Sequence, residues 1–119
     1  MRLGGLLLIL LAAACAEEPS IIASDNQAGQ EDRAALANEI EAKISLPDPR
    51  FQVSDYTRYY RMVGNKVEGL YIAQGNDEAV WIESEDQIPM VLDGGCSVFS
   101  FSYDPAEGEF GIMACNGVA

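Results

Sequence analysis

The sequence predicts an α+β domain in which one N-terminal helix packs on an antiparallel meander sheet of about five or six strands. Three observations predict this two-layer fold. An apolar pattern with helical spacing occurs once, ahead of residue 46. From residue 51 onward, alternating apolar residues and hairpin turns take over. Two cysteines, Cys96 and Cys115, flank the final hairpin and could join its ends by a disulfide.

The predicted helix covers residues 31–45. Its apolar residues recur at helical spacing and form one stripe, which consists of Leu36, Ala37, Ile40 and Ile44. Pro47 ends the helix, because the residue before a proline avoids helical geometry. We expect this stripe to pack against one face of the sheet.

The first predicted hairpin joins strands at 56–63 and 66–73 through Gly64-Asn65, a two-residue turn in which glycine takes a positive φ. In this register Arg61 lies directly opposite Glu68 as an ion pair, and Met62 lies directly opposite Val67 as an apolar pair. The third strand is predicted at 79–84. Pro89 then opens a short edge-like run at 90–92, and a turn follows at 93–95.

The final hairpin is predicted at 97–103 and 109–116, with a turn at 104–108 that glycine closes. Alternation sets Phe99, Phe101 and Tyr103 on one face, and Phe110, Ile112 and Ala114 on one face of the return strand. Two registers keep these faces adjacent. One sets Phe99 opposite Ile112, Phe101 opposite Phe110 and Cys96 opposite Cys115; the other leaves the cysteines diagonal.

The first 14 residues have the parts of an export signal, namely Arg2 and an apolar run that is too short to span a bilayer. The stretch Leu11-Ala-Ala-Ala-Cys15 resembles a bacterial lipoprotein signal. This resemblance implies cleavage before Cys15, lipid attachment to Cys15 and, with Ala16 following, the periplasmic face of the outer membrane. The alternative is secretion to the periplasm, with cleavage after Ala14 or after Ala16. Residues 15–30 are then a polar tether, and residues 31–119 form a single domain.

Three cysteines in an exported chain require a separate role for one of them. If Cys15 carries lipid, Cys96 and Cys115 remain as a disulfide pair in an oxidising compartment. The alternative is that both are free, buried thiols.

Charge and composition exclude several functions. The net charge is −12, which argues against nucleic acid as a partner and favours a basic protein. The chain has no histidine, so the common catalytic bases and most zinc sites are excluded. The carboxylates at 83–86 lack the pattern of a calcium loop, and Cys96 has no neighbour in sequence that would stabilise a thiolate. We therefore expect no catalytic residue, no metal site and no cofactor.

The most suggestive surface is the tyrosine- and arginine-rich strand at 56–61, because these residue types are enriched at binding hot spots. Alternation sets Arg58 and Tyr60 on one face, where Tyr71 joins them, and Tyr59 and Arg61 on the other. Arg58, Tyr60 and Tyr71 are the candidate partner surface; the alternative is that such side chains cover the sheet and pair with carboxylates. Trp81 is expected to pack in the core or at the sheet edge.

The expected function is that of a non-catalytic exported lipoprotein domain that binds an envelope protein or component. One alternative is a secreted small-ligand carrier, or a carboxylate-dependent hydrolase, with a cavity between helix and sheet. Another is an acidic inhibitor of a basic, envelope-attacking enzyme, which the net charge of −12 favours.

Overall fold

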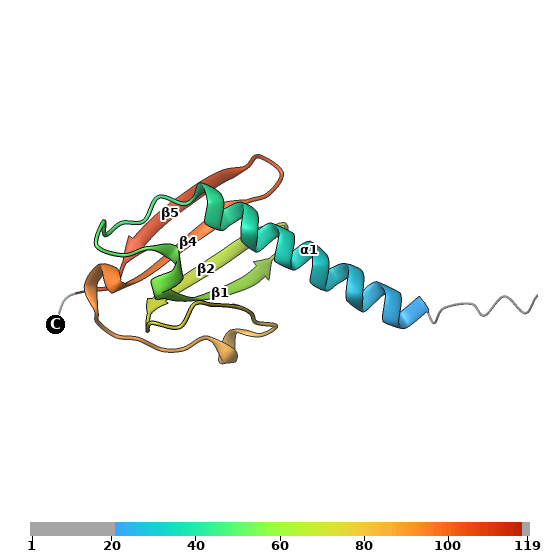
Figure 1. Ribbon diagram of the computed structural model, residues 1–119, viewed down its shortest axis with the longest axis horizontal. Helices are drawn as coiled ribbons and strands as arrows, with labels where there is room; N and C mark the ends of the chain where they lie inside the picture. The colour runs from blue at the N-terminus through green and yellow to red at the C-terminus, as the bar shows by residue number, and fades with distance from the viewer. Residues whose placement is uncertain (1–20, 118–119) are drawn as a thin grey trace, which may run out of the picture.

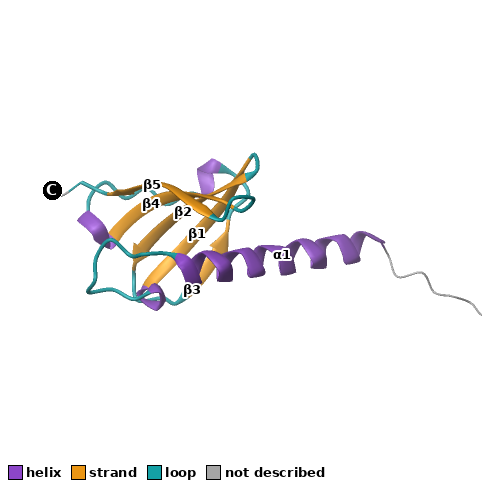
Figure 2. Cartoon of the chain, turned by 90° about the horizontal axis from the view of Figure 1, so that it is seen from above, coloured by secondary structure: helices purple, strands orange, loops and turns teal. Residues whose placement is uncertain are grey.

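A computed structural model describes residues 21–117 and consists of one helix packed against a five-stranded mixed sheet. Figure 1 shows α1 (Ile21–Lys43) crossing the sheet diagonally, with its N-terminal half extending past the strands. Figure 2 shows the helix along one side of the sheet. The predicted signal segment and Cys15 lie outside the described residues.

The α1 helix begins ten residues earlier than predicted, within the segment expected to be a tether. Its apolar stripe lies where it was predicted. Ala37 and Ile40 are buried in the core, and Leu36 and Ile44 pack beside them. The stripe is confined to this C-terminal part of α1, which explains why apolar spacing located the packed part of the helix and missed its first turns.

The first hairpin confirms the prediction. Strands β1 (Tyr56–Val63) and β2 (Lys66–Ala73) pair antiparallel, with Arg61 opposite Glu68 and Met62 opposite Val67. Gly64 takes a φ of +62° in the turn, a conformation that favours glycine.

The prediction of a purely antiparallel meander is wrong, because β3 (Glu78–Trp81) runs parallel to β1. The strand order is β3-β1-β2-β4-β5. After β2 ends beside Tyr56, residues 74–77 carry the chain around the end of β1, where the Gly75 N–H donates to the Asp55 carbonyl at 3.1 Å. The chain therefore starts β3 beside Thr57 and follows β1 in the same direction.

The segment at 82–94 forms no strand, so the predicted run at 90–92 is also wrong. It contains the short 3₁₀ turn η2 (Glu85–Gln87) and links β3, at one edge, to the far half of the sheet. In place of a neighbouring strand, a side-chain amide donates hydrogen bonds to two main-chain carbonyls of this segment. Asn116 Nδ2 donates to the Val91 carbonyl at 2.7 Å and to the Asp93 carbonyl at 3.3 Å.

The final hairpin pairs β4 (Val98–Asp104) with β5 (Glu109–Cys115) in a register that changes at a β-bulge. Next to the turn Tyr103 pairs with Phe110, as in the predicted register that leaves the cysteines diagonal. Beyond the bulge Phe101 pairs with Met113 and Phe99 pairs with Cys115. The predicted pairs Phe99 with Ile112 and Phe101 with Phe110 are therefore wrong.

The bulge has a direct effect on which side chains reach the core. One extra residue on β5 makes two residues oppose one on β4. Met113 consequently takes the inward position that alternation gave to Ile112, and Ile112 is 87% exposed. Gly111 suits this position, because a Cβ atom there would lie 2.2 Å from Ser102 Oγ.

Aromatic rings fill the layer between α1 and the sheet. Tyr56, Tyr60, Tyr71, Phe99 and Tyr103 are fully buried, and neighbouring ring centroids lie 4.8–6.1 Å apart. Phe99, Phe101 and Tyr103 of β4 belong to the same core cluster as Ala37 and Ile40 of α1. The opposite face of the sheet has no helix among the described residues.

Candidate binding site

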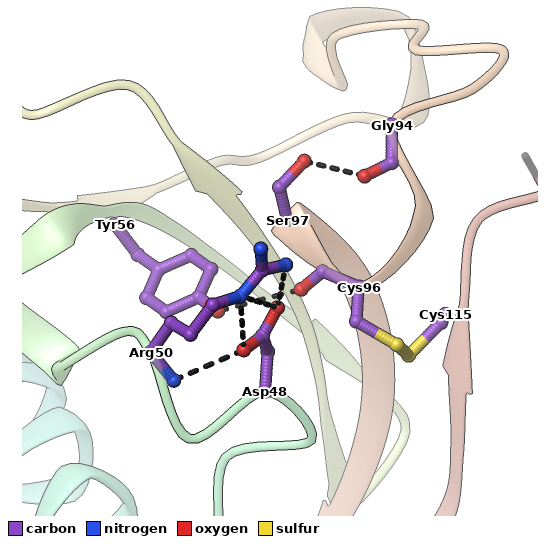
Figure 3. Close-up of a disulfide and its surroundings, with 7 residues drawn as sticks. All are labelled: Asp48, Arg50, Tyr56, Gly94, Cys96, Ser97 and Cys115. Atoms are coloured by element: carbon purple, nitrogen blue, oxygen red, sulfur yellow. Dashed lines mark hydrogen bonds and ion pairs between the residues drawn. A yellow bond between two sulfur atoms is a disulfide. The ribbon is translucent and has the colours of Figure 1, made fainter.

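The disulfide between Cys96 and Cys115 is formed, with Cα atoms 4.7 Å apart (Figure 3). Cys96 lies in the 3₁₀ turn η3 (Gly95–Ser97), not in β4, and this turn brings it beside the end of β5. Ser97 Oγ donates to the Gly94 carbonyl at 2.6 Å and so closes η3. The bond joins η3, which follows the 82–94 segment, to the end of β5, the last strand in the sheet order. Neither cysteine is available as a nucleophile.

The predicted surface of Arg58, Tyr60 and Tyr71 does come together, but beneath α1. All three residues are buried, at 6%, 0% and 0% exposed. The prediction that they present a partner surface is corrected by this burial. The strands β1 and β2 turn these side chains toward the helix, and Glu41 of α1 pairs with Arg58 and Tyr60.

Arg58 makes hydrogen bonds to four different residues of this cluster. Its guanidinium donates to the Glu41 carboxylate, to Asp77 Oδ1 at 2.8 Å, and to the Val53 and Tyr56 carbonyls at 3.1 and 3.0 Å. A buried charge requires this kind of pairing. Arg58 therefore fixes α1 and the 74–77 turn to β1.

The two tyrosine hydroxyls continue the cluster. Tyr60 Oη lies 2.6 Å from Tyr71 Oη and 3.2 Å from Glu41 Oε1. Burial raises the pKa of Tyr60 and of Tyr71 well above the usual range, since a phenolate would lose its hydration there. The nearby Glu41 carboxylate raises both pKa values further. Both hydroxyls stay neutral and hold the helix on the sheet.

A second contact between helix and sheet edge involves Trp81, which packs at the sheet edge as predicted. Its ring lies 5.2 Å from that of Tyr60, and the Arg33 guanidinium lies 5.7 Å from the Trp81 ring. Arg33 Nη1 also donates to Glu83 Oε1 at 2.6 Å. This pairing lowers the pKa of Glu83 and makes that carboxylate a structural partner of α1.

The remaining carboxylates at 84–86 lie in an exposed turn. Asp86 accepts a hydrogen bond from the Ser84 hydroxyl. Within residues 21–117, no group of three cysteine, aspartate or glutamate residues is placed to hold a metal ion.

The sheet face opposite α1 holds a half-open groove of about 380 Å³. Its apolar lining comes from four segments that are distant in sequence: Tyr59, Leu70, Ile82, Ile88, Ile112 and Ala114. Ser100, Ser102, Arg61 and Glu68 supply its polar groups. The 82–94 segment contributes Ile82 and Ile88 and so covers part of this face.

Two features of the groove are relevant to binding. Ile112 lines the groove and is 87% exposed, so together with the other lining residues it offers apolar surface to a partner. Arg61 Nη2 donates to Glu68 Oε2 at 2.7 Å, but the Nε atom of Arg61 is buried and has no acceptor among the described residues. A donor of this kind is ordinarily paired.

Sequence reasoning placed Tyr59 and Arg61 correctly on the face away from Arg58, but it assigned no role to that face. Ile112 was expected in the core, because strict alternation does not anticipate a bulge. The signal that could have revealed it is Gly111, since a glycine inside a strand often marks a bulge.

No helix among the described residues is both long enough and apolar enough to cross a membrane. The comparisons found no matching family model, no similar curated protein and no similar solved structure.

Proposed function

We propose that this protein is a non-catalytic, lipid-anchored domain of the bacterial envelope that binds another protein through the sheet face opposite α1. The anchor is a lipid on Cys15, on the periplasmic face of the outer membrane. The groove beside Ile112 is the observation that supports binding.

The shape and chemistry of the groove favour a protein as the partner. Its lining combines apolar side chains with polar groups from Arg61, Glu68, Ser100 and Ser102. Protein interfaces combine an apolar centre with such a polar rim. A partner side chain could cover Ile112, which is 87% exposed.

The position and length of α1 suit a domain that is tethered to a membrane. Its first residue is only six positions after Cys15, and a helix of 23 residues is about 35 Å long. With lipid on Cys15, α1 would act as a semi-rigid spacer between the membrane and the sheet. The groove lies on the side of the sheet that α1 leaves uncovered.

The engagement of the polar groups beneath α1 supports a non-catalytic role. Arg58, Glu41 and the two tyrosine hydroxyls satisfy one another. The pKa shifts of Tyr60 and Tyr71 keep the neutral form, which is the opposite of what an acid–base group working near neutral pH requires.

A small-ligand carrier is the second candidate, and the groove volume of about 380 Å³ is the observation that favours it. The layer between helix and sheet, where a carrier cavity was expected, is filled by aromatic rings instead. A ligand would thus have to bind in the open groove, where much of its surface would stay in water.

Metabolic labelling with a radioactive fatty acid tests the anchor. The wild-type chain is expected to incorporate label and to remain in the membrane fraction, whereas Cys15→Ala is expected to lose both. Label on the Cys15→Ala variant, or none on wild type, contradicts lipid attachment at this residue.

Capture from envelope extract by the full-length chain tests the binding face. Ile112→Lys introduces a charge at the groove rim and is expected to reduce capture of a protein that wild type retains. Met62→Lys is the matched control, because Met62 is an exposed apolar residue of β1 that lies on the opposite face from Arg61 and does not line the groove. Equal capture by all three proteins contradicts the proposed face.

A further inference from the structure

We infer that the partner adds an extended segment to the free edge of β5, with alternate side chains in the groove. This inference rests on the proposed function and specifies the partner's chemistry: an uncharged segment of alternating apolar residues with lysine or arginine at its C-terminal end. Such strand addition supplies main-chain hydrogen bonds for affinity and side-chain pockets for specificity.

The hydrogen-bond pattern identifies the free main-chain groups of β5. Since β5 is the last strand in the sheet order, β4 is the only strand within residues 21–117 that pairs with it. The Asn116 N–H donates to the Val98 carbonyl at 2.9 Å, so the main chain of Ala114, two residues earlier, also faces β4. The N–H and C=O groups of Met113 and Cys115 must then point away from the sheet.

The composition of this edge is unusual for an edge left in water. Residues 110–119 carry no charged side chain, in a protein with a net charge of −12. Exposed edge strands are normally protected by lysine, proline or inward-pointing charges. Within β5 the protective features are Glu109 and the bulge at 111–112, and the regular stretch from Met113 to Cys115 has neither.

The groove lies on the same side of the sheet as two β5 side chains. Ile112 and Ala114 both line it, beside Ser100 and Ser102 of β4. A strand added next to β5 would point every second side chain toward the same face, because strand side chains alternate with a period of two. Apolar residues at those positions would cover Ile112.

Charge sets the polarity of the added strand. The turn that opens β5 carries Asp104, Glu107 and Glu109, and the nearest cation, Lys43, already interacts with Glu39 and the Tyr103 hydroxyl. Antiparallel pairing is the more stable arrangement per residue. It places the C-terminal end of the added strand beside this acidic turn, where a basic residue is favoured.

A second copy of this chain suits the edge less well. Two β5 strands would provide the main-chain bonds, but each copy carries a net charge of −12 and no cation in β5 to meet the other's acidic turn. We therefore assign the edge to a different, basic partner.

The test uses the full-length protein in detergent and the synthetic peptide acetyl-Thr-Val-Thr-Ile-Thr-Val-Lys-Lys-amide. Amide hydrogen exchange by NMR is the readout, because it reports hydrogen bonding at single N–H groups. Saturating peptide is expected to slow exchange at Met113 and Cys115 at least about tenfold while leaving the amides of the β1–β2 hairpin unchanged. Replacing the two lysines with glutamates should weaken binding about fivefold or more.

Two variants provide controls. Met113→Pro removes an N–H that the sheet does not use, whereas Met113→Leu keeps it; only the proline variant should lose the peptide. If Met113→Pro unfolds, Ile112→Lys with its control Met62→Lys tests the side-chain contacts of the added strand, and protection of the Met113 and Cys115 amides in wild type tests the main-chain bonds.

The outcomes separate this inference from the proposed function. Strand addition alone is overturned if the peptide shifts the groove resonances but does not protect the Met113 and Cys115 amides. It is also overturned if the peptide does not bind while groove-dependent capture from envelope extract persists. Protection that grows with protein concentration in the absence of peptide indicates self-pairing and overturns the assignment to a basic partner. Loss of both peptide binding and groove-dependent capture overturns both proposals.

Discussion

At the scale of single residues, the buried Tyr60 hydroxyl is held by two side-chain hydrogen bonds. Its hydroxyl lies between Tyr71 Oη and the Glu41 carboxylate, in a site without solvent exposure. Since Glu41 can only accept when ionised, Tyr60 donates to Glu41 and accepts from Tyr71. The Tyr60 and Tyr71 hydroxyls therefore differ in how much each contributes to the free energy of unfolding.

Removing these hydroxyls one at a time should reveal that inequality. Tyr60→Phe leaves the Tyr71 hydroxyl buried without an acceptor and should lower the free energy of unfolding by about 1–3 kcal/mol. Tyr71→Phe leaves the Tyr60–Glu41 bond intact and should cost less. Urea unfolding of both variants and of the double variant measures this. Equal costs for the two single variants would contradict the chain of donors.

Asp48 should make stability depend on pH in the acid range (Figure 3). The Arg50 side chain donates to both Asp48 oxygens, at 2.6–3.2 Å, and the Arg50 N–H adds a bond of 3.0 Å. These bonds lower the pKa of Asp48 from 3.8 to about 2. Because the pKa is lower in the folded state, Asp48 contributes stability above pH 3.8 that is lost as pH falls toward 2.

Acid unfolding of Asp48→Asn checks this linkage. The variant should be less stable than wild type at pH 6, and the difference should shrink as the pH falls toward 2. Glu85→Gln is a control in an exposed turn outside this contact. A stability difference that stays constant between pH 6 and pH 2 would refute the role of ionised Asp48.

At the scale of secondary-structure elements, the β2–β4 pairing depends on a glycine. Gly69 lies directly opposite Phe101, and a Cβ atom at Gly69 would come within 2.2–2.8 Å of the buried Phe101 ring. Gly69→Ala should therefore destabilise the protein by about 1–3 kcal/mol through overpacking. Thermal unfolding provides the measurement.

A compensating substitution distinguishes a steric clash from a general preference for glycine. Phe101→Leu in the Gly69→Ala background should recover part of the lost stability. Gly117→Ala serves as the control with open space around it and should change stability little. Additive losses in the Gly69→Ala, Phe101→Leu double variant would rule out the clash.

The disulfide should stabilise β5 and η3 together. The cysteines are 19 residues apart, and closing a loop of this size contributes about 3 kcal/mol in the chain-entropy model. The Cys96→Ser, Cys115→Ser variant should lose this stability, with hydrogen exchange accelerating first in β5. Uniform acceleration across all strands would show that the bond has no local role.

The sequence predicted the elements whose pattern is local. The β1–β2 register follows from a two-residue turn and the pairs it creates, and the helix stripe follows from Leu36, Ile40 and Ile44. The cysteine pairing follows from their count and from the final hairpin. Each of these depends on residues that are close in sequence or chemically distinctive.

Long-range placement was not predictable in the same way. The four residues between β2 and β3 fit a simple hairpin as well as a path around β1, and only the completed sheet excludes the hairpin. The candidate surface at Arg58 failed because the face that α1 covers is a property of the whole fold. The groove joins five segments between residues 59 and 114, so no sequence window contained it.

At the scale of the whole molecule, the two faces of the sheet have different roles. One face holds α1 through aromatic packing and the Arg58–Glu41 pair. The other face has a groove with Ile112 at its rim. Our central proposal is that a partner protein in the envelope covers this second face while lipid on Cys15 holds the domain at the membrane.

Site-specific photo-crosslinking in intact cells of the native host tests this proposal most directly. A photoreactive phenylalanine derivative is placed at Ile112, or at Met62 as an exposed control position on the other face of the sheet. Irradiation should give one adduct of defined mass from position 112 and none from position 62. The absence of an adduct at 112, or the same adduct from both positions, would contradict the account.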